Sequence, residues 1–324
     1  SVGVVLLHGM SDSPYSLRAL GERLHATGAH VLGLRLPGHG TVPSGLVELE
    51  ADDMMAATRL AVRHLASQLD GRPIHLVGYS TGAALAVIYT LETIQNPALP
   101  SVQRLVLLSP AIGVSPAAAF ASWQARIGHL LGIELLAWND LLPEYDPYKY
   151  NSFAVNAGDV VYQLTQEIRQ RLTALTMAAE PADFPPILAF ASIVDATVST
   201  PALVDGLFAQ LPRGGHELVL FDINRVAAAE PLLTAKPEAV IQALRGLPDR
   251  KFTLSVVGNQ DPTKLDVVVR QQLPGGATTT EPLGLSWPRD VYSLSHVAVP
   301  FPPTDPLYGG VPETGAPLQL GNLA

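Results

Sequence analysis

The amino-acid sequence predicts an α/β protein built on a mostly parallel β-sheet with helices on both faces. Apolar segments of strand length alternate with longer amphipathic segments along most of the chain, and several strand-like segments are continuous apolar runs. Strands of a parallel sheet have this texture because both of their faces are covered, and the alternation is typical of βαβ units. With 48% apolar and 15% charged residues, the 324-residue chain has enough material for a large buried core.

The first third of the chain gives the clearest alternation. Strands are expected at Val2–Leu7, Val31–Leu36, Ile74–Tyr79 and Arg104–Leu108. Helices are expected between them at Pro14–Ala26, Asp52–Leu69 and Gly82–Gln95, the first with leucines on one face. Turns rich in Gly and Pro separate these elements.

After Pro110 the pattern becomes mainly helical, and residues 113–180 are expected to form a cap inserted over the sheet. Residues 1–112 and 181–324 then form the core domain. Its further strands are expected at Ile187–Ile193, Glu217–Phe221, Phe252–Val257 and Val291–Leu294, with helices near Pro201–Leu211 and Pro237–Leu244. No element is assigned between Thr263 and Arg289, and the proline-rich tail is expected to be extended.

Composition excludes several classes of protein. A net charge of −9 without a basic stripe argues against nucleic-acid binding, and the absence of cysteine removes disulfides and thiolate sites. No apolar run approaches the ~18 residues of a membrane span, which favours a soluble protein. The chain opens directly on an apolar strand without a signal segment, so we expect an incomplete N-terminus and assign no compartment.

The segment IHLVGYSTGAAL, residues 74–85, places Ser80 in a Gly-x-Ser-x-Gly pattern. A strand runs directly into this pattern and a helix runs directly out of it. Such a sharp turn lifts the central side chain clear of the sheet edge and aims the start of the helix at it. A serine in an ordinary turn needs neither the strand nor the helix, so the context predicts that Ser80 is a nucleophile.

A nucleophilic serine needs a base and an orienting acid, expected later in the chain and after strands. Of the nine histidines, only His216 and His296 follow the candidate acids. His216 opens a strand, which is the wrong end for a site at the carboxyl edge of a sheet. His296 closely follows the last expected strand, so we predict that His296 is the base.

Three aspartates are candidates for the acid. Asp195 follows the strand ILAFASI, Asp222 ends the strand ELVLF, and Asp205 lies inside an expected helix. Chain order and strand-end position favour Asp195, and Asp222 remains a competitor.

The oxyanion of acyl transfer requires two backbone donors. One is expected to be the N–H of Thr81, directly after the nucleophile, and the other the N–H of Met10 in the loop LLHGMSDSP after the first strand. His8 and Gly9 allow a tight turn before Met10. A simple turn explains the same residues, so this second donor is a hypothesis.

Five segments appear together in the order seen in α/β-hydrolases: LLHGMSDSPYSLRALGERL, LRLPGHGTVPSGL, GYSTGAALA, SIVDATVS and SLSHVAVPF. The chain most resembles the bacterial carboxylesterase and monoacylglycerol-lipase branch, over about residues 2–112 and 187–299. The resemblance implies the α/β-hydrolase fold with Ser80 as nucleophile, His296 as base, Asp195 as acid, and Met10 and Thr81 as oxyanion donors. The insertion then corresponds to the cap that shapes the acyl pocket.

Three features depart from the family pattern. The chain begins at the family's third strand, the loop reads HGM rather than HGGG, and His296 follows Asp195 at an unusually large separation, which leaves Asp222 open as the acid. The expected function is hydrolysis of small-molecule carboxylic esters, with short or medium acyl chains or monoacylglycerol-like, without metal or organic cofactor. Thioester or amide hydrolysis, acyl transfer, perhydrolysis and a non-catalytic ligand-binding relative are the alternatives.

Overall fold

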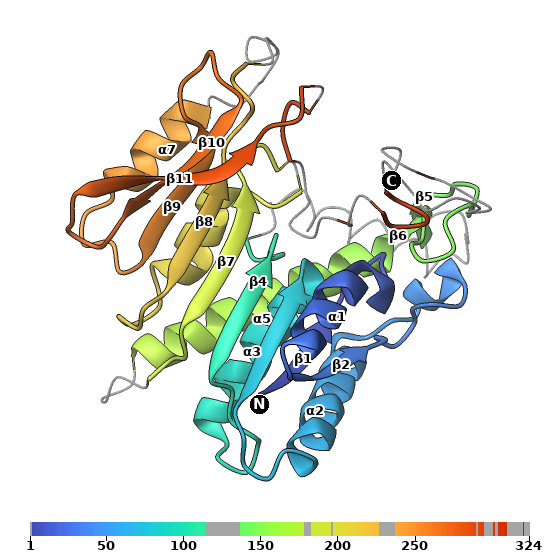
Figure 1. Cartoon of the computed structure of the whole chain (residues 1–324). Coiled ribbons are helices and arrows are strands. Elements are labelled where there is room, and N and C mark those ends of the chain that lie inside the picture. Colours follow the sequence, from blue (N-terminus) through green and yellow to red (C-terminus); the bar gives the residue numbers. More distant parts are fainter. Residues whose placement is uncertain are drawn as a thin grey trace.

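The computed structural model describes residues 2–113, 137–177, 183–195, 197–226, 237–289, 291–294, 301, 304–309 and 320. Its centre is a nine-stranded sheet (Figure 1). The strands are β1 (Gly3–Leu7), β2 (His30–Leu34), β3 (Ile74–Tyr79), β4 (Arg104–Leu108), β7 (Ile187–Ser192), β8 (Glu217–Phe221), β9 (Thr253–Asn259), β10 (Asp266–Gln272) and β11 (Thr278–Ser286). They follow the order β11-β10-β9-β8-β7-β4-β3-β1-β2. All neighbours from β2 to β9 are parallel, as the sequence predicted.

Alternate side chains of β1 divide the core into two layers. Val5 and Leu7 belong to the main core cluster, whereas Val4 and Leu6 belong to a second cluster on the opposite face. All five residues of β1 are buried, which is why its sequence reads as a continuous apolar run.

Helices cover both faces of the sheet (Figure 1). They are α1 (Arg18–Ala26), α2 (Ala51–Ser67), α3 (Thr81–Gln95), α5 (Val155–Thr176), α6 (Thr200–Leu203) and α7 (Pro237–Arg245), with short helical turns η1 (Pro14–Leu17), η2 (Pro43–Leu46) and η4 (Val204–Phe208). Leu17, Leu20 and Leu24 of η1 and α1 pack in the second cluster, as their spacing predicted. Helices α2, α3 and α5 pack in the main core.

Helix α3 lies innermost, because every residue from Thr81 to Glu92 is buried. A helix that is apolar on all sides is expected between a sheet and other helices. At its far end, Glu92 accepts hydrogen bonds from Arg59 of α2 at 2.6 and 2.8 Å and from Arg171 of α5 at 3.3 Å. The Glu92 carboxylate thus joins the three helices and fixes the far end of α3, the helix that directly follows Ser80.

The segment expected to form the cap contains two described parts. Trp138–Asp140 (β5) and Phe153–Ala154 (β6) form a small antiparallel pair, and α5 follows directly. Seven buried residues of α5 face the core: Val155, Ala157, Val160, Leu164, Thr165, Ile168 and Leu172. Residues 114–136 lie outside the described residues, so the cap and its boundaries stay a prediction.

The end of the core domain differs from expectation in two respects. The unassigned region contains β10 and β11, an antiparallel hairpin that extends the sheet. The prediction of a short strand at Val291–Leu294 is wrong. The carbonyl groups of this segment accept hydrogen bonds from the Ser192 hydroxyl and from Asn224, and the segment has no strand pairing. Among the described helices, none combines the length and apolarity that crossing a membrane requires.

Candidate active site

Ser80 stands at the junction of β3 and α3 with φ 52° and ψ −113°. A positive φ is uncommon for a residue other than glycine and marks backbone strain that the surrounding structure must enforce. The two flanking glycines provide the space for this turn. A Cβ on Gly78 would lie 2.4 Å from the Cα of Ala83, and one on Gly82 would lie 2.1 Å from the Leu7 carbonyl oxygen. The Gly-x-Ser-x-Gly pattern is therefore required by backbone contacts.

Backbone hydrogen bonds hold the turn in place. The Ser80 N–H donates to the Leu108 carbonyl oxygen at 2.9 Å, and the Ser80 carbonyl oxygen accepts from Ala111 at 3.0 Å and from Ala83 at 3.1 Å. The end of β4 thus fixes the turn from one side. Thr81 is the first residue of α3, where an N–H has no acceptor within its own helix. Among the described residues, this N–H has no other backbone acceptor either.

The loop after β1 passes directly against this turn. A Cβ on Gly9 would lie 3.2 Å from the ring of Tyr79, and the carbonyl oxygen of His8 lies close to Gly82. Met10 is buried, and its N–H has no backbone acceptor within the described part of the chain. The loop that holds Met10 and the start of α3 at Thr81 thus meet at one corner, and within the described residues neither N–H has a backbone acceptor.

His8 and His39 lie behind this loop and contact each other edge to face, with ring centroids 4.9 Å apart. The Nδ1 of His8 lies 2.8 Å from the Gly9 carbonyl oxygen, and its Nε2 accepts from the Leu36 N–H at 3.1 Å. The Nε2 of His39 lies 2.6 Å from the Met10 carbonyl oxygen. Burial and, to a smaller extent, the neighbouring His39 lower the pKa of His8 to about 3. His8 is therefore neutral near pH 7.

Asp195 lies three residues beyond the end of β7 and is half-buried. Its Oδ1 accepts hydrogen bonds from the Thr197 N–H at 2.8 Å and the Val198 N–H at 2.9 Å. Burial raises the pKa of Tyr79, and the charges of Asp12 and Asp195 raise it further. Asp195 therefore lies near the residue that directly precedes Ser80.

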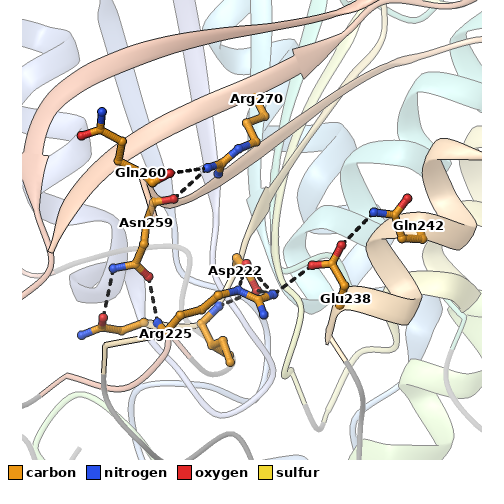
Figure 2. A network of polar contacts seen from close by, with 9 residues as sticks. Asp222, Arg225, Glu238, Gln242, Asn259, Gln260 and Arg270 are labelled. Carbon is orange, nitrogen blue, oxygen red and sulfur yellow. Dashed lines mark hydrogen bonds and ion pairs between the residues drawn. The ribbon is translucent and has the colours of Figure 1, made fainter. Parts of the chain in front are cut away.

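Asp222 is engaged in a different network (Figure 2). Its carboxylate oxygens accept from the Arg225 guanidinium at 3.0 and 3.2 Å, and Arg225 also contacts Glu238 at 3.3 Å. Burial raises the pKa of Asp222, whereas the Ile223 N–H and Arg225 lower it. The arginine charge that compensates Asp222 gives this carboxylate a structural partner of its own. Asp205, the third candidate acid, lies in η4.

His296 lies outside the described residues, and the chain is described as far as Leu294 just before it. The carbonyl oxygen of Leu294 accepts a hydrogen bond from the Ser192 hydroxyl. The carbonyl oxygens of Tyr292 and Val291 accept from the N–H and the Nδ2 of the fully buried Asn224, at 2.6 and 2.9 Å. The chain that leads to His296 thus runs along the carboxyl ends of β7 and β8, on the side where Asp195 lies.

His216, which the sequence rejected as a base, is buried at the opposite edge of the sheet. Its Nδ1 accepts from the Ile187 N–H at 3.2 Å, and its Nε2 lies 3.0 Å from the Pro212 carbonyl oxygen. The Ile187 contact joins the amino ends of β7 and β8, and the Pro212 contact lies in the loop before β8, so this histidine has a structural role away from Ser80.

Sequence reasoning did not find two groups near the loop after β1. One is the pair His8 and His39. Its only signal in the sequence is a His-Gly pair that follows each of the neighbouring strands β1 and β2. The other is an aromatic cluster in which Tyr15 stacks on Tyr148 with ring centroids 3.7 Å apart.

Two tyrosine–aspartate contacts join this cluster to the C-terminal segment 304–309. The Tyr15 hydroxyl donates to Asp305 at 3.3 Å, and the Tyr308 hydroxyl donates to Asp146 at 2.7 Å. Repeated Asp-Pro pairs at 146 and 305 were the available sequence signal. Within the described residues, no group of three or more His, Asp or Glu side chains is arranged to hold a metal ion.

Comparison with known proteins places the fold. The model of the hydrolase family described as "Serine aminopeptidase, S33" matches residues 2–221. No curated protein matches the sequence.

Three solved structures show the same fold at low identity. One belongs to the metagenome-derived lipolytic enzymes LipS and LipT, with 21% identity, TM-score 0.51 and coverage of 76% of this chain and 94% of that one. The Paleococcus ferrophilus monoacylglycerol lipase has 21% identity, TM-score 0.50 and coverage of 68% and 84%. A soluble variant of the Saccharomyces cerevisiae monoglyceride lipase has 15% identity, TM-score 0.53 and coverage of 68% and 77%. The α/β-hydrolase fold predicted from the sequence is thereby confirmed.

Proposed function

Since the chain belongs to the serine aminopeptidase S33 family of hydrolases, we propose that it hydrolyses carboxylic esters through an acyl-enzyme on Ser80. The observation that carries this proposal is the backbone of Ser80, held at φ 52° between β3 and α3 with the N–H of Thr81 directly behind it. Strain at one partly exposed turn residue, enforced by glycines on both sides, is the expected signature of a presented nucleophile.

In the proposed reaction, His296 takes the Ser80 proton as Ser80 Oγ attacks the ester carbonyl carbon. Asp195 stabilises the resulting imidazolium, and the N–H groups of Met10 and Thr81 hold the oxyanion. The C–O bond to the alcohol breaks as His296 returns the proton to the leaving oxygen. Water activated by His296 then releases the acid and restores Ser80. The oxyanion assignment is supported by the N–H groups of Met10 and Thr81, which have no backbone acceptor among the described residues.

The ion pair of Asp222 with Arg225 supports Asp195 as the acid. The acid of a triad stabilises the positive charge of the imidazolium. The negative charge of Asp222 is already paired with the largely buried Arg225. Segment 291–294 is bound at the ends of both β7 and β8, and its last described residue, Leu294, accepts from Ser192 at the end of β7, the strand that Asp195 follows.

For the substrate, we propose esters with short or medium acyl chains, including monoacylglycerols. Two of the solved structures with this fold are named for monoacylglycerol or monoglyceride hydrolysis. A neutral glycerol ester also suits a protein with net charge −9, which repels anionic substrates at long range.

The test is covalent labelling of Ser80 with a fluorophosphonate, together with hydrolysis of p-nitrophenyl acetate, butyrate and octanoate. We expect labelling and turnover in the wild type, and loss of both in Ser80→Ala. Retained turnover in Ser80→Ala would remove the nucleophile from the proposal. A wild-type protein that takes no label and hydrolyses no ester would instead be a non-catalytic relative.

Peptide-bond hydrolysis is the second candidate, and the description of the matching family favours it. The same triad serves amides, thioesters and acyl transfer, because the pocket rather than the nucleophile selects the substrate. Aminoacyl p-nitroanilides assayed beside the p-nitrophenyl esters separate the two candidates. Faster turnover of the anilides relative to the matched esters would identify a peptidase.

A further inference from the structure

We propose that His8 is a positioning residue for the oxyanion hole: it fixes the Gly9–Met10 peptide so that the Met10 N–H faces the Ser80 turn. This inference rests on the proposed function, in which the Met10 N–H is one of the two oxyanion donors. His39 supports the same loop from the next peptide.

The first step concerns the peptide between Gly9 and Met10. In a planar trans peptide the C=O and the N–H point in opposite directions. A donor that holds the Gly9 carbonyl oxygen therefore also sets the direction of the Met10 N–H. The His8 Nδ1 lies 2.8 Å from that oxygen, and the Asp12 N–H donates to it at 3.2 Å. Both donors hold one side of the peptide and leave the Met10 N–H on the other.

The second step concerns the proton on the His8 ring. The Nε2 accepts from the Leu36 N–H at 3.1 Å, so the single proton of the neutral ring lies on Nδ1, where it is donated to Gly9. The ring is fully buried, and its pKa of about 3 keeps it neutral at the pH at which an esterase works, while the Leu36 N–H selects the tautomer. The His8 Nδ1–H therefore remains a donor to the Gly9 carbonyl oxygen over the whole pH range in which an esterase works.

The third step concerns the anchoring of the ring itself. Leu36 lies beyond the end of β2, and His8 directly follows β1, the parallel neighbour of β2. The hydrogen bond from Leu36 to His8 thus ties the loop to a second strand end. His39, three residues after Leu36, packs against the His8 ring and places its Nε2 2.6 Å from the Met10 carbonyl oxygen. The carbonyl oxygens of the peptides on both sides of Met10 thus each lie within hydrogen-bond distance of an imidazole nitrogen.

The expected consequence is selective for the transition state. A misplaced donor stabilises the oxyanion less, and this negative charge forms only during the reaction. Removing one such donor altogether costs about 100- to 1,000-fold in kcat. The His8→Leu variant keeps the Met10 N–H but loses its restraint, so we expect kcat for p-nitrophenyl acetate to fall by about 10- to 100-fold. We expect KM to change by less than about threefold, because the substrate carbonyl carries little charge in the ground state.

A second readout excludes a general structural effect. A trifluoromethyl ketone adds to Ser80 reversibly and forms an oxyanion, so its affinity should fall by the same factor as kcat/KM in His8→Leu. The His8→Asn variant places an amide donor at the Nδ1 position, and we expect it to recover most of kcat. The His8→Gln variant places its amide near the Nε2 position and should remain impaired.

The matched control is His216→Leu, because His216 is equally buried, also accepts from a backbone N–H and also contacts a carbonyl oxygen. We expect this control to lower Tm without changing the inhibitor affinity of the folded protein. If His8→Leu fails to fold, the comparison of His8→Asn with His8→Gln decides. Equal activity of these two variants, or a folded His8→Leu with wild-type kcat and inhibitor affinity, would overturn the proposal.

Failure of the proposed function gives a different result. In that case the wild type itself takes no fluorophosphonate at Ser80 or keeps its activity in Ser80→Ala, and the role of His8 falls with it. Wild-type labelling at Ser80 with unchanged kinetics in His8→Leu overturns only the inference about His8.

Discussion

The hydroxyl of Ser192 donates a hydrogen bond to the carbonyl oxygen of Leu294, 102 positions away in the sequence. Ser192 is the last residue of β7, and Leu294 lies two residues before His296. Asn224, which follows β8, binds the same segment at Tyr292 and Val291. These contacts anchor the chain leading to the proposed base at the ends of two strands, β7, which Asp195 follows, and β8, which Asp222 follows.

The first prediction follows from this anchor. Ser192→Ala should lower kcat/KM for p-nitrophenyl esters by about tenfold, because a small displacement of a catalytic group is costly. Ser255→Ala is the control. Ser255 is equally buried and donates a hydrogen bond to Glu217, which the variant loses, but Ser255 lies in the body of β9. Similar kinetics in the two variants would show that the Ser192 contact does not position the base.

A second prediction separates the two candidate acids. Asp195→Asn should lower kcat by at least about 1,000-fold while leaving Tm nearly unchanged, as expected when the partner of a catalytic histidine is neutralised. Asp222→Asn should leave kcat per folded molecule near the wild-type value. It should lower the free energy of unfolding by about 1–3 kcal/mol, because Arg225 loses the less exposed of its two carboxylate partners and keeps only Glu238. The opposite pattern would identify Asp222 as the acid.

A third prediction concerns the turn at Ser80. In an ordinary helix, alanine in place of glycine stabilises by about 1 kcal/mol. Gly158→Ala in α5 should behave in this way, because the nearest atom to the new Cβ lies 3.9 Å away. Gly82→Ala should do the reverse and abolish most activity, because its Cβ would lie 2.1 Å from the Leu7 carbonyl oxygen. Urea unfolding and ester hydrolysis of both variants measure the difference, and equal stabilisation would contradict the backbone contact.

The fourth prediction is a pH dependence of stability. The pKa of His8 is about 3 in the folded protein and near the ordinary histidine value of 6.5 in the unfolded chain. Between these values the unfolded chain binds more protons, so this group makes the free energy of unfolding decrease as the pH falls. The expected slope is about 1.4 kcal/mol per pH unit below pH 6.5.

Urea unfolding at pH 7, 5.5 and 4 measures this slope. His8→Asn removes the titrating group, so its stability should decrease less steeply than that of the wild type over the same range. The difference between the two proteins isolates His8 from the other titrating groups. Parallel curves would mean that His8 does not titrate as a buried group.

Most of the sheet could be predicted because parallel strands buried on both faces read as continuous apolar runs. Segments such as Val4–Leu7 and Leu105–Leu108 carry that information in their own residues. The hairpin of β10 and β11 could not be predicted in this way. Every residue of β11 is exposed, so its sequence carries no burial pattern, and its pairing with β10 alone makes it a strand.

The candidate site divides along the same line. Ser80 could be predicted as the nucleophile because both flanking glycines can be read beside it in the sequence, although the contact that requires Gly82 is made with Leu7 of β1. The competition between Asp195 and Asp222 is not local, since it depends on where the Arg225 guanidinium and the segment 291–294 lie. The role inferred for His8 depends likewise on the Leu36 N–H from a neighbouring strand end. The sequence by itself determined the fold class and predicted Ser80 as the nucleophile, whereas hydrogen bonds between distant strand ends, which only the tertiary structure forms, decided what surrounds Ser80.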